Sequence, residues 1–303
     1  MNHPLQWKKY PVLNDGFICL VDVMGDDYAI VQAARKSYDK DLQEAGLWQG
    51  ATDRSTLRFM MRLGHTSPFE MVEFKFLVRV PMDCWRQWIR HRTANVNEYS
   101  TRYTEAIDSQ QTTSPGEWRL QATDNKQGSS GYLEGEIGEL IAAEDFTALV
   151  LDTNEYQYGS KTDAGHLLST EESLYHKIAK NLYNLRLKFG IAKEQARKDL
   201  PLSTYTEAYW KCDLHNIFNF LRLRMDSHAQ VEIRSYANAM AEIVKQVCPV
   251  AWEAFEDYVL YAKKFSRMEM EMLKANFNLD DVDWHKPESM TDREWKEFLN
   301  KLS

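Results

Sequence analysis

The sequence predicts an α+β fold, a helix-rich single domain with a small antiparallel sheet. Residues 72–80 alternate apolar with mostly charged side chains, which is the pattern of an antiparallel strand with one buried face. Between Ala229 and Val247 apolar residues recur at alternating steps of four and three, the period of an amphipathic helix. The chain has 303 residues, of which 44% are hydrophobic, and is therefore long enough to bury a sizeable core.

The segments before residue 72 are predicted to form a strand and two helices. Residues 16–23 are largely apolar and lie between turn-forming residues, which indicates a buried strand, and a helix is expected over residues 28–38. Asp53 is predicted to cap a short second helix. Gly64 is predicted to end that helix in a left-handed conformation.

A third helix is predicted to begin at Pro81, directly after the strand at 72–80. Proline suits the first helical position because its missing N–H would have no partner there. The residues expected to face the core are Trp85, Trp88 and Ile89. Gln87 and Arg90 are three residues apart and are expected to share another face, where both reach one ligand.

The chain is interpreted as a catalytic domain of residues 1–262 followed by a C-terminal helical extension of residues 263–303. Residues 104–174 hold polar loops and are interpreted as an insertion in the catalytic domain. Helical periodicity returns at Tyr175 and ends at Gly190. The extension contains a capping box, Thr291 to Glu294, in front of an amphipathic helix.

Composition excludes several classes of protein. The cysteines Cys19, Cys84, Cys212 and Cys248 lack CxxC spacing and are expected to be reduced core thiols, and no cluster has metal-ligand spacing, so no metal is expected. No apolar segment follows the N-terminal charges, and no stretch has the length needed to cross a bilayer. We expect a cytoplasmic protein without a membrane partner.

An unusual concentration of arginine marks the candidate site. Four arginines occur within seventeen residues that contain one acid, Glu98; they are Arg86, Arg90, Arg92 and Arg102. Guanidinium groups suit phosphate, and the net charge of the chain is -8, so the cluster favours a small polyanionic ligand. A nucleic acid partner is not expected because it would require a basic face. The sequence contains no GxGxxG or P-loop pattern.

Several short motifs occur in a characteristic order. Arg90, His91 and Arg92 are followed, after seven residues, by Ser100, and further blocks lie at 64–70, 196–202 and 219–230. This arrangement resembles the flavin-dependent thymidylate synthase family over roughly residues 15–103 and 175–260.

The resemblance implies reductive methylation of dUMP to dTMP, with 5,10-methylenetetrahydrofolate as carbon donor and NADPH as reductant through FAD. It also implies a homotetramer whose active sites are shared between subunits. Three alternatives remain open. The first is a related flavin- and folate-dependent methyl- or hydroxymethyltransferase that acts on another pyrimidine nucleotide. The others are a non-catalytic nucleotide-binding protein and an arginine-lined oligomer interface.

The resemblance also assigns residues to roles. Arg224 is implied to ionise N3 of the uracil, and the structural alternative is a salt-bridged helix arginine. The implied nucleotide contacts are Gln87, Arg90, Glu98, Ser100, Thr101, Arg102, Arg197 and Arg224. Among these, Arg102 and Arg197 are expected at the phosphate, with Arg197 supplied by another subunit. Thr101 is expected to bind through its backbone N–H.

The implied flavin contacts are Ser67 of a neighbouring chain, Arg90, His91, Arg92, Glu98, Asp213, Leu214, His215 and Asn219. For Glu98 the alternative is charge balance for Arg90 or Arg102. His65 is expected either to line the approach of folate or NADPH or to be structural, and His228 is equally open between function and structure.

Overall fold

The structure is a computed structural model that describes residues 3–36, 48–123, 128–140, 162–276, 284–288 and 290–302. It divides into two units, Met1–Leu260 and Tyr261–Ser303, each of which has its own internal contacts. We describe the two units separately.

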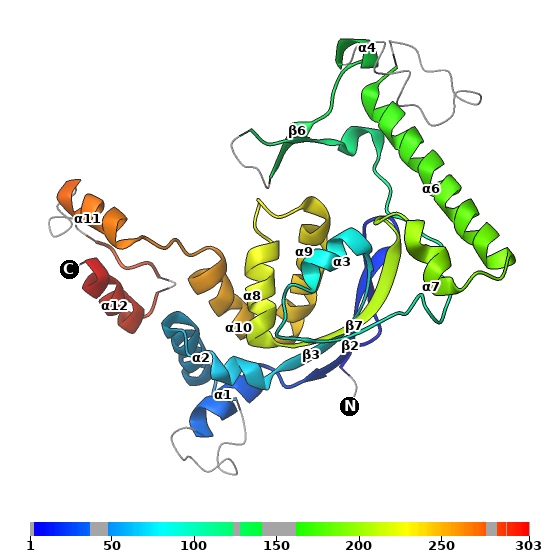
Figure 1. The fold of residues 1–303 in the computed structure, drawn as a ribbon. Helices are drawn as coiled ribbons and strands as arrows, with labels where there is room; N and C mark the ends of the chain where they lie inside the picture. Colours follow the sequence, from blue (N-terminus) through cyan, green and yellow to red (C-terminus); the bar gives the residue numbers. More distant parts are fainter. Residues whose placement is uncertain are drawn as a thin grey trace. The chain divides into compact units, whose positions relative to one another are not determined.

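A five-stranded antiparallel sheet forms the centre of the first unit (Figure 1). Its strands, in spatial order, are β1 (Lys9–Val12), β2 (Gly16–Met24), β3 (Glu73–Pro81), β7 (Tyr205–Asp213) and β4 (Asn95–Glu98). In the middle of the sheet Phe76 of β3 lies opposite Leu20 of β2 and Trp210 of β7. The predicted α+β class and the strands predicted at 16–23 and 72–80 are confirmed.

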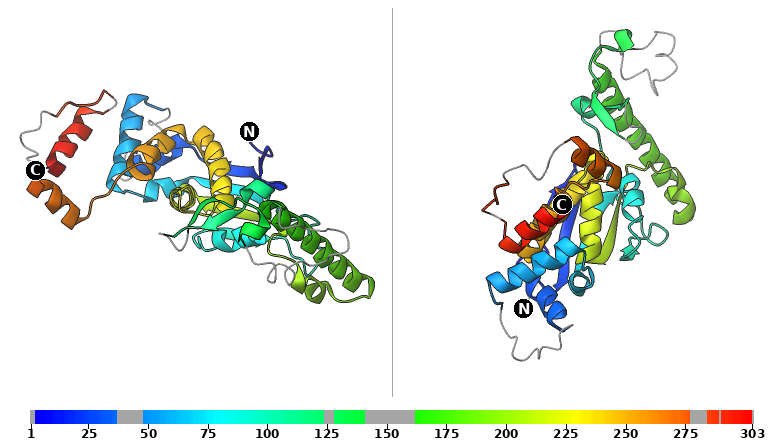
Figure 2. Two further views of the ribbon diagram at one scale, coloured as in Figure 1. Left: turned by 90° about the horizontal axis from the view of Figure 1, so that it is seen from above. Right: turned by 90° about the vertical axis from the view of Figure 1, so that its left-hand side faces the viewer.

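Most helices of this unit lie beside the sheet, whereas the long helix α6 (Ala164–Lys188) extends away from it (Figure 2). The α-helices are α1 (Asp27–Lys36), α2 (Ala51–Leu63), α3 (Met82–Trp88), α4 (Ile137–Leu140), α6 (Ala164–Lys188), α7 (Lys193–Ala196), α8 (Leu214–Arg224), α9 (Val231–Val247) and α10 (Pro249–Phe255). The shorter turns are η1 (Ser67–Met71), η2 (Pro115–Glu117), η3 (Arg197–Asp199) and the π-helical turn η4 (Glu256–Leu260). A separate hairpin consists of β5 (Arg119–Gln121) and β6 (Ser129–Tyr132).

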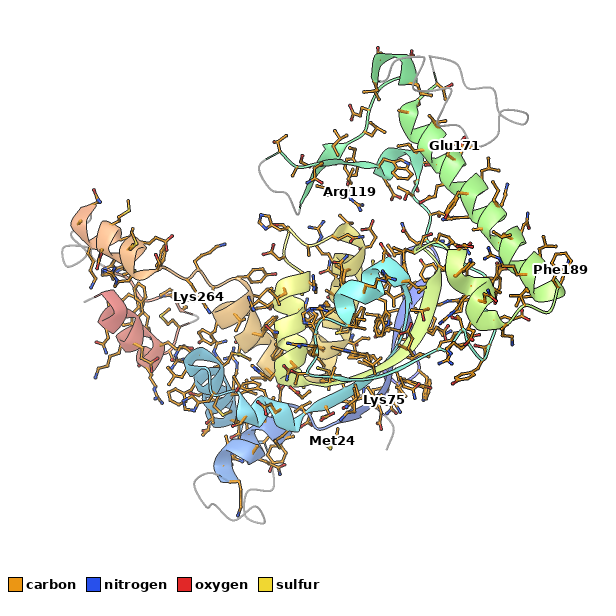
Figure 3. The ribbon with its side chains drawn as sticks, viewed as in Figure 1. Met24, Lys75, Arg119, Glu171, Phe189 and Lys264 are labelled. Carbon is orange, nitrogen blue, oxygen red and sulfur yellow. The ribbon has the colours of Figure 1, made fainter. Side chains whose placement is uncertain are left out.

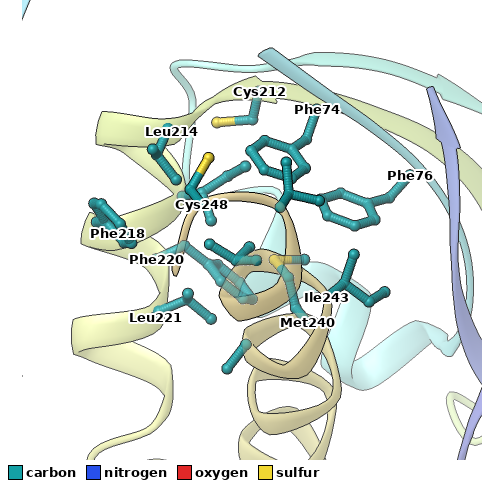
Figure 4. Close-up of a cluster of buried hydrophobic side chains, with 14 of the residues drawn as sticks. Phe74, Phe76, Cys212, Leu214, Phe218, Phe220, Leu221, Met240, Ile243 and Cys248 are labelled. Atoms are coloured by element: carbon teal, nitrogen blue, oxygen red, sulfur yellow. The ribbon is translucent and has the colours of Figure 1, made fainter. Parts of the chain in front are cut away.

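The core lies between one face of the sheet and helices α8, α9 and α10. Phe74 and Phe76 of β3 point toward Met240 and Ile243 of α9, as Figure 4 shows. The stripe predicted along 229–247 is therefore core and not a cofactor site. The four cysteines are buried and free, as predicted, and burial raises the pKa of each thiol.

Asp53 is not the helix cap that the sequence predicted. Helix α2 begins at Ala51 after Gly50, and the Asp53 side chain is only 1% exposed within its first turn. Its carboxylate pairs with Arg35 of α1 and accepts the N–H of Gln49 at 2.7 Å. The helix ends as predicted, at Gly64, whose φ of 72° is left-handed.

Helix α3 is shorter than the sequence predicted, with consequences for two residues. Pro81 is the residue before the helix and not its first position, and Trp88 is the last helical residue. Ile89 is therefore 43% exposed and does not face the core. Arg90 lies in the following turn, so it does not share a helix face with Gln87. Trp85 and Trp88 are buried as expected.

Helix α6 carries two different faces. It begins at Ala164, well before the predicted start, because the Asp163 side chain caps it by accepting the His166 N–H at 3.0 Å. The residues buried within its own chain are Ala164, Gly165, Leu167, His176, Ala179 and Tyr183. The predicted apolar stripe lies elsewhere and is exposed; it consists of Tyr175, Ile178, Leu182, Leu185 and Phe189. Phe189, at the helix end in Figure 3, is 74% exposed.

The second unit contains helices α11 (Arg267–Asn276) and α12 (Asp292–Leu302). The predicted capping box precedes α12: Thr291 N–H donates to Glu294 Oε2 at 2.7 Å, and Glu294 N–H donates back to Thr291 Oγ1 at 3.2 Å. Among the residues described in either unit, no helix combines the length and apolar character needed to span a membrane.

Replacing Gly16 with alanine is expected to destabilise the sheet. An added Cβ would lie 1.9 Å from the Tyr236 hydroxyl, which donates to the Arg79 carbonyl at 2.7 Å. Displacing this hydroxyl is expected to lower the free energy of unfolding by about 1–3 kcal/mol in denaturant titrations. Gly116→Ala is the matched control, because nothing lies within 4 Å of its added Cβ. Equal stability of the two variants would contradict this packing.

Candidate active site

The loop after β4 is held in shape by the neighbouring strand and by its own hydrogen bonds. Tyr99 N–H donates to the Glu207 carbonyl of β7 at 2.7 Å, and the Tyr99 hydroxyl donates to the Glu105 carbonyl at 2.7 Å. The Ser100 carbonyl accepts the N–H of Tyr103 at 3.1 Å. The loop therefore turns back on itself over residues 99–105.

This loop presents free backbone donors beside a guanidinium. Within the described part of the chain, the consecutive N–H groups of Ser100, Thr101 and Arg102 make no hydrogen bond. Arg197 of η3 donates to Thr101 Oγ1 at 2.5 Å. Successive free N–H groups next to a cation suit an anionic oxygen cluster such as a phosphate.

A cavity of about 450 Å³ opens at the same place. The predicted residues that line it are Arg86, Glu98, Ser100, Thr101 and Arg197. Arg197 thus joins the loop of its own chain; that another subunit supplies it to the rest of the site stays a prediction. Arg102 is exposed and pairs with Glu194 at 3.3 Å, so it lies at the rim.

Glu98 is held by two neutral donors and not by an arginine. Trp85 Nε1 donates to Glu98 Oε2 at 3.0 Å, and the Thr206 hydroxyl donates to Glu98 Oε1 at 2.9 Å. Among the described residues it makes no ion pair with Arg90 or Arg102. The alternative interpretation of Glu98 as charge balance for these arginines is wrong. Its negative charge remains available inside the cavity.

A second group of predicted residues surrounds Arg224 at the end of α8. Arg224 Nε donates to His91 Nε2 at 3.1 Å, and Arg224 Nη2 donates to the Gln87 carbonyl at 3.2 Å. Arg224 makes no ion pair within the part of the chain that the structure describes. The structural alternative, a salt-bridged helix arginine, is therefore wrong. A half-buried guanidinium without a carboxylate partner is a strong local source of positive potential.

The charge on His91 follows from this geometry. Burial lowers the pKa of His91, and the nearby Arg224 guanidinium lowers it further, to about 4. Because arginine only donates, Nε2 of His91 is the acceptor and the ring proton resides on Nδ1. Burial also lowers the pKa of Arg224, but an arginine remains protonated at any physiological pH.

His91 is expected to remain the neutral Nδ1–H tautomer down to about pH 5, well below the ordinary histidine pKa of about 6.5. Since its pKa is lower folded than unfolded, its contribution to stability is lost as the pH falls from about 6.5 through 4. Ring ¹⁵N shifts measured against pH test this. Arg224→Met is expected to raise the pKa only partly, since burial remains. Titration of His91 near pH 6.5 in the unaltered protein would contradict the arrangement.

A smaller cavity of about 160 Å³ lies between η1, α2, α8 and α10. Its polar lining includes His65, His215, Asn219 and Arg222. Its apolar lining is Met60, Met61, Phe69, Phe218, Phe255 and Val259. Arg222 donates to Asn219 Oδ1 at 3.0 Å. The Asn219 amide nitrogen takes no part in this bond. A planar ring with polar edges fits such a lining.

Three arginines of the predicted cluster remain without partners. Arg86, Arg90 and Arg92 are exposed, and none makes an ion pair or hydrogen bond with another described residue. The chain has a net charge of -8, so acids are plentiful, yet these three guanidinium groups pair with none of the described ones. They are therefore suited to bind an external anion. Ser67 is likewise exposed, at the start of η1.

Comparison with known proteins agrees with this chemistry. A family profile described as "Thymidylate synthase complementing protein" matches residues 19–250. The flavin-dependent thymidylate synthase of Thermus thermophilus is 44% identical over 88% of this chain and 84% of the relative. The flavin-dependent thymidylate synthase of Rickettsia conorii is 42% identical over 95% of this chain and 91% of the relative. The chain belongs to the flavin-dependent thymidylate synthase family.

A solved structure resembles this family member. It is the UMP/dUMP methylase PolB from Streptomyces cacaoi bound with 5-Br dUMP, with a TM-score of 0.64 and 28% identity. The likeness covers 82% of this chain and 98% of PolB.

Two of the flavin contacts implied by the family already have a role in the fold. Leu214 is fully buried, and its N–H donates to the Val72 carbonyl at 2.8 Å. The Asp213 carboxylate caps α8 by accepting the Asn216 N–H at 2.9 Å and the Asn216 side-chain amide at 2.8 Å. Both residues therefore position α8, which carries His215, Asn219 and Arg224; their contact with a flavin stays a prediction.

One chain of this family member holds the predicted residues in separate groups. Among the described residues, no hydrogen bond or ion pair joins Arg224 or Gln87 to Ser100, Thr101 or Arg197. His228 belongs to neither group, since it is exposed and pairs with Asp226 at 2.7 Å.

Sequence reasoning missed the residues that orient the predicted ones. Trp85 and Thr206 hold Glu98, whereas Gln230 contacts Gln87. Trp85 was assigned to the core alone, although the N–H of a buried indole needs an acceptor. Thr206 and Gln230 lie more than a hundred residues from their partners, so no local pattern indicates these contacts.

Proposed function

We propose that this protein is an enzyme that transfers a methyl group to dUMP and forms dTMP, with 5,10-methylenetetrahydrofolate as carbon donor. The observation that carries the proposal is the half-buried Arg224 guanidinium, which donates to a neutral His91 and has no carboxylate partner among the described residues. Family membership and the UMP/dUMP methylase neighbour support the choice of a pyrimidine nucleotide.

Arg224 would activate the pyrimidine ring by electrostatics. Carbon 5 of uracil becomes nucleophilic when N3 loses its proton or when the ring is polarised toward O4. A fixed cation stabilises that negative charge without reorganisation during the reaction. A carboxylate beside Arg224 would neutralise this field, and the neutral His91 orients the guanidinium without doing so.

The nucleotide phosphate would lie in the loop of residues 100–102. The three free N–H groups and the Arg197 guanidinium there are all hydrogen-bond donors that carry partial or full positive charge, as a phosphate requires. Glu98 remains in the same cavity as an oriented acceptor. We propose Gln87, Arg90 and Arg102 as further nucleotide contacts.

The residues present fit FAD. The small cavity with His65, His215 and Asn219 offers an apolar slot with polar edges, and the unpaired Arg90 and Arg92 match a pyrophosphate. FAD, when bound, supplies the hydride that completes the methyl group, and NADPH is the proposed source of its electrons. Ser67, His91 and Glu98 are proposed flavin contacts. His65 is proposed to line the approach of folate or NADPH.

We propose that the enzyme is a cytoplasmic homotetramer and that one exposed face of α6 forms a subunit contact. Its apolar residues Tyr175, Ile178, Leu182, Leu185 and Phe189 recur at alternating steps of three and four. This spacing lines one side of a helix and is the spacing of helices that pack together between chains. A shared assembly would also bring the separate residue groups of different chains together.

Leu182→Glu is expected to weaken the assembly. The substitution places a charge in the middle of the exposed apolar stripe of α6 and leaves the neighbouring buried face, with Ala179 and Tyr183, unchanged. Light scattering coupled to size exclusion should show a species smaller than the unaltered protein. Lys177→Glu is the control, because it changes charge on the same helix outside the stripe. An unchanged mass for Leu182→Glu would contradict the proposed contact.

The reaction itself is tested by tritium release from C5-labelled dUMP and by the appearance of dTMP, with FAD, NADPH and methylenetetrahydrofolate omitted in turn. Arg224→Ala is expected to lower turnover by about 10²–10³ or more while FAD stays bound. Arg267→Ala, a surface arginine of the second unit paired with Glu271, is expected to retain full activity. Loss of FAD and of the folded state in Arg224→Ala would assign Arg224 a structural role instead.

A second candidate differs in the nucleotide. The UMP/dUMP methylase PolB has been solved with 5-Br UMP as well as with 5-Br dUMP. A related methyl- or hydroxymethyltransferase acting on another pyrimidine nucleotide is therefore the alternative. Product analysis with UMP and dCMP in place of dUMP separates the two. Nucleotide binding without any flavin-dependent product would indicate a binding protein.

A further inference from the structure

The side chain of Gln87 belongs to a chain of hydrogen bonds that begins at one acid, Asp83. Gln87 Nε2 donates to Gln230 Oε1, and Gln230 Nε2 donates to Asp83 Oδ2 at 3.4 Å. Gln230 is the N-cap residue, directly before α9, whereas Asp83 and Gln87 lie on α3. Arg224 Nη2 holds the Gln87 carbonyl from the other side. The backbone and the amide of Gln87 are thus both fixed.

The acid at the end of this chain decides its direction. An amide has a donor end and an acceptor end, whereas a carboxylate only accepts. The other Asp83 oxygen, Oδ1, already accepts the Cys84 N–H at 2.7 Å. Gln230 must therefore turn its nitrogen toward Asp83 and its oxygen toward Gln87. Gln87 must in turn use its nitrogen for this bond.

Glu232, two residues after Gln230, is paired with an arginine of the neighbouring hairpin. Its side chain is buried in the first turn of α9 and pairs with Arg119 of β5 at 2.5 Å; Figure 3 labels Arg119 on this hairpin. Burial raises the pKa of Glu232, but the hydrogen bonds that it accepts, chiefly the one from Arg119, outweigh burial and leave the pKa below its usual value. Glu232 is therefore ionised and paired with Arg119, and Asp83 is the acid that the Gln230 amide contacts.

We propose that Asp83 fixes the polarity of the Gln230–Gln87 pair, so that Gln87 presents its side-chain oxygen to the nucleotide. Within the described part of the chain, Gln87 Oε1 accepts no hydrogen bond. Gln87 then recognises a donor on the nucleotide, which is either a hydroxyl of the sugar or the N3–H of the pyrimidine ring. This inference rests on the proposed function, in which Gln87 contacts the nucleotide. Asp83 and Gln230 are positioning residues.

The test uses the FAD-loaded enzyme and calorimetric dissociation constants for three nucleotides. These are dUMP, 2′,3′-dideoxyuridine 5′-monophosphate, which lacks the sugar hydroxyl, and N3-methyl-dUMP, which lacks the ring N–H. The unaltered enzyme is expected to bind one of the two analogues about tenfold or more weaker than dUMP, because Gln87 Oε1 then has no donor. The analogue that is penalised identifies the donor.

Asp83→Asn changes the polarity with almost no change in shape. The asparagine oxygen retains the Cys84 N–H, and its NH₂ group then faces Gln230 and favours the reversed amide. The penalty on the affected analogue is expected to fall to about threefold or less. Asp22→Asn is the matched control, since Asp22 accepts a glutamine amide, that of Gln6 at 3.0 Å, away from the site.

Three results would overturn the inference. The first is equal affinity of the unaltered enzyme for all three nucleotides. The second is an unchanged analogue penalty in Asp83→Asn with a normal melting temperature. The third is the absence of dUMP binding to the unaltered, FAD-loaded enzyme, which would overturn the proposed function together with this inference. In the first two cases the enzyme still binds dUMP, so those results overturn the inference alone.

Discussion

The position of the Arg224 guanidinium is the constraint on which the rest of the site depends. It lies where the end of α8 meets the end of α3, and this meeting is fixed by aromatic packing. The Trp88 and Phe220 rings lie 4.8 Å apart, and the His91 ring contacts Phe220 at 4.9 Å. The aromatic core therefore places His91 as a neutral partner for Arg224. The positive potential around the guanidinium is not offset, because no described acid pairs with it.

The same separation of charges extends across the arginine-rich segment. Glu98 accepts hydrogen bonds from Trp85 and Thr206, and Glu232 pairs with Arg119. Each of these two acids thus has its own donor, and the cations near the site are left to an external anion. The β5–β6 hairpin takes part in this arrangement through Arg119, which pairs with Glu232 of α9.

The sequence predicted those parts of the structure whose cause is local. Alternation indicated β3, helical periodicity indicated α9, and a concentration of arginines with one acid indicated the anion site. Asp53 and Ile89 were assigned incorrectly because their surroundings are set by distant residues: Arg35 takes the Asp53 carboxylate, and α3 ends before Ile89. The hydrogen bonds from Asp83 to Gln230 and Gln87 join segments far apart in the chain, and no spacing in the sequence indicates them.

The central claim is that the group around Arg197 and the group around Arg224 meet between subunits to form one active site. Co-expression of Arg197→Ala with Arg224→Ala, followed by purification of mixed assemblies through two tags, tests it most directly. Each variant alone is expected to be inactive. Random mixed assemblies should recover roughly a quarter of the unaltered dTMP-forming activity, because about one site in four combines two intact contributors. Mixed assemblies that bind FAD and form no dTMP would contradict shared sites.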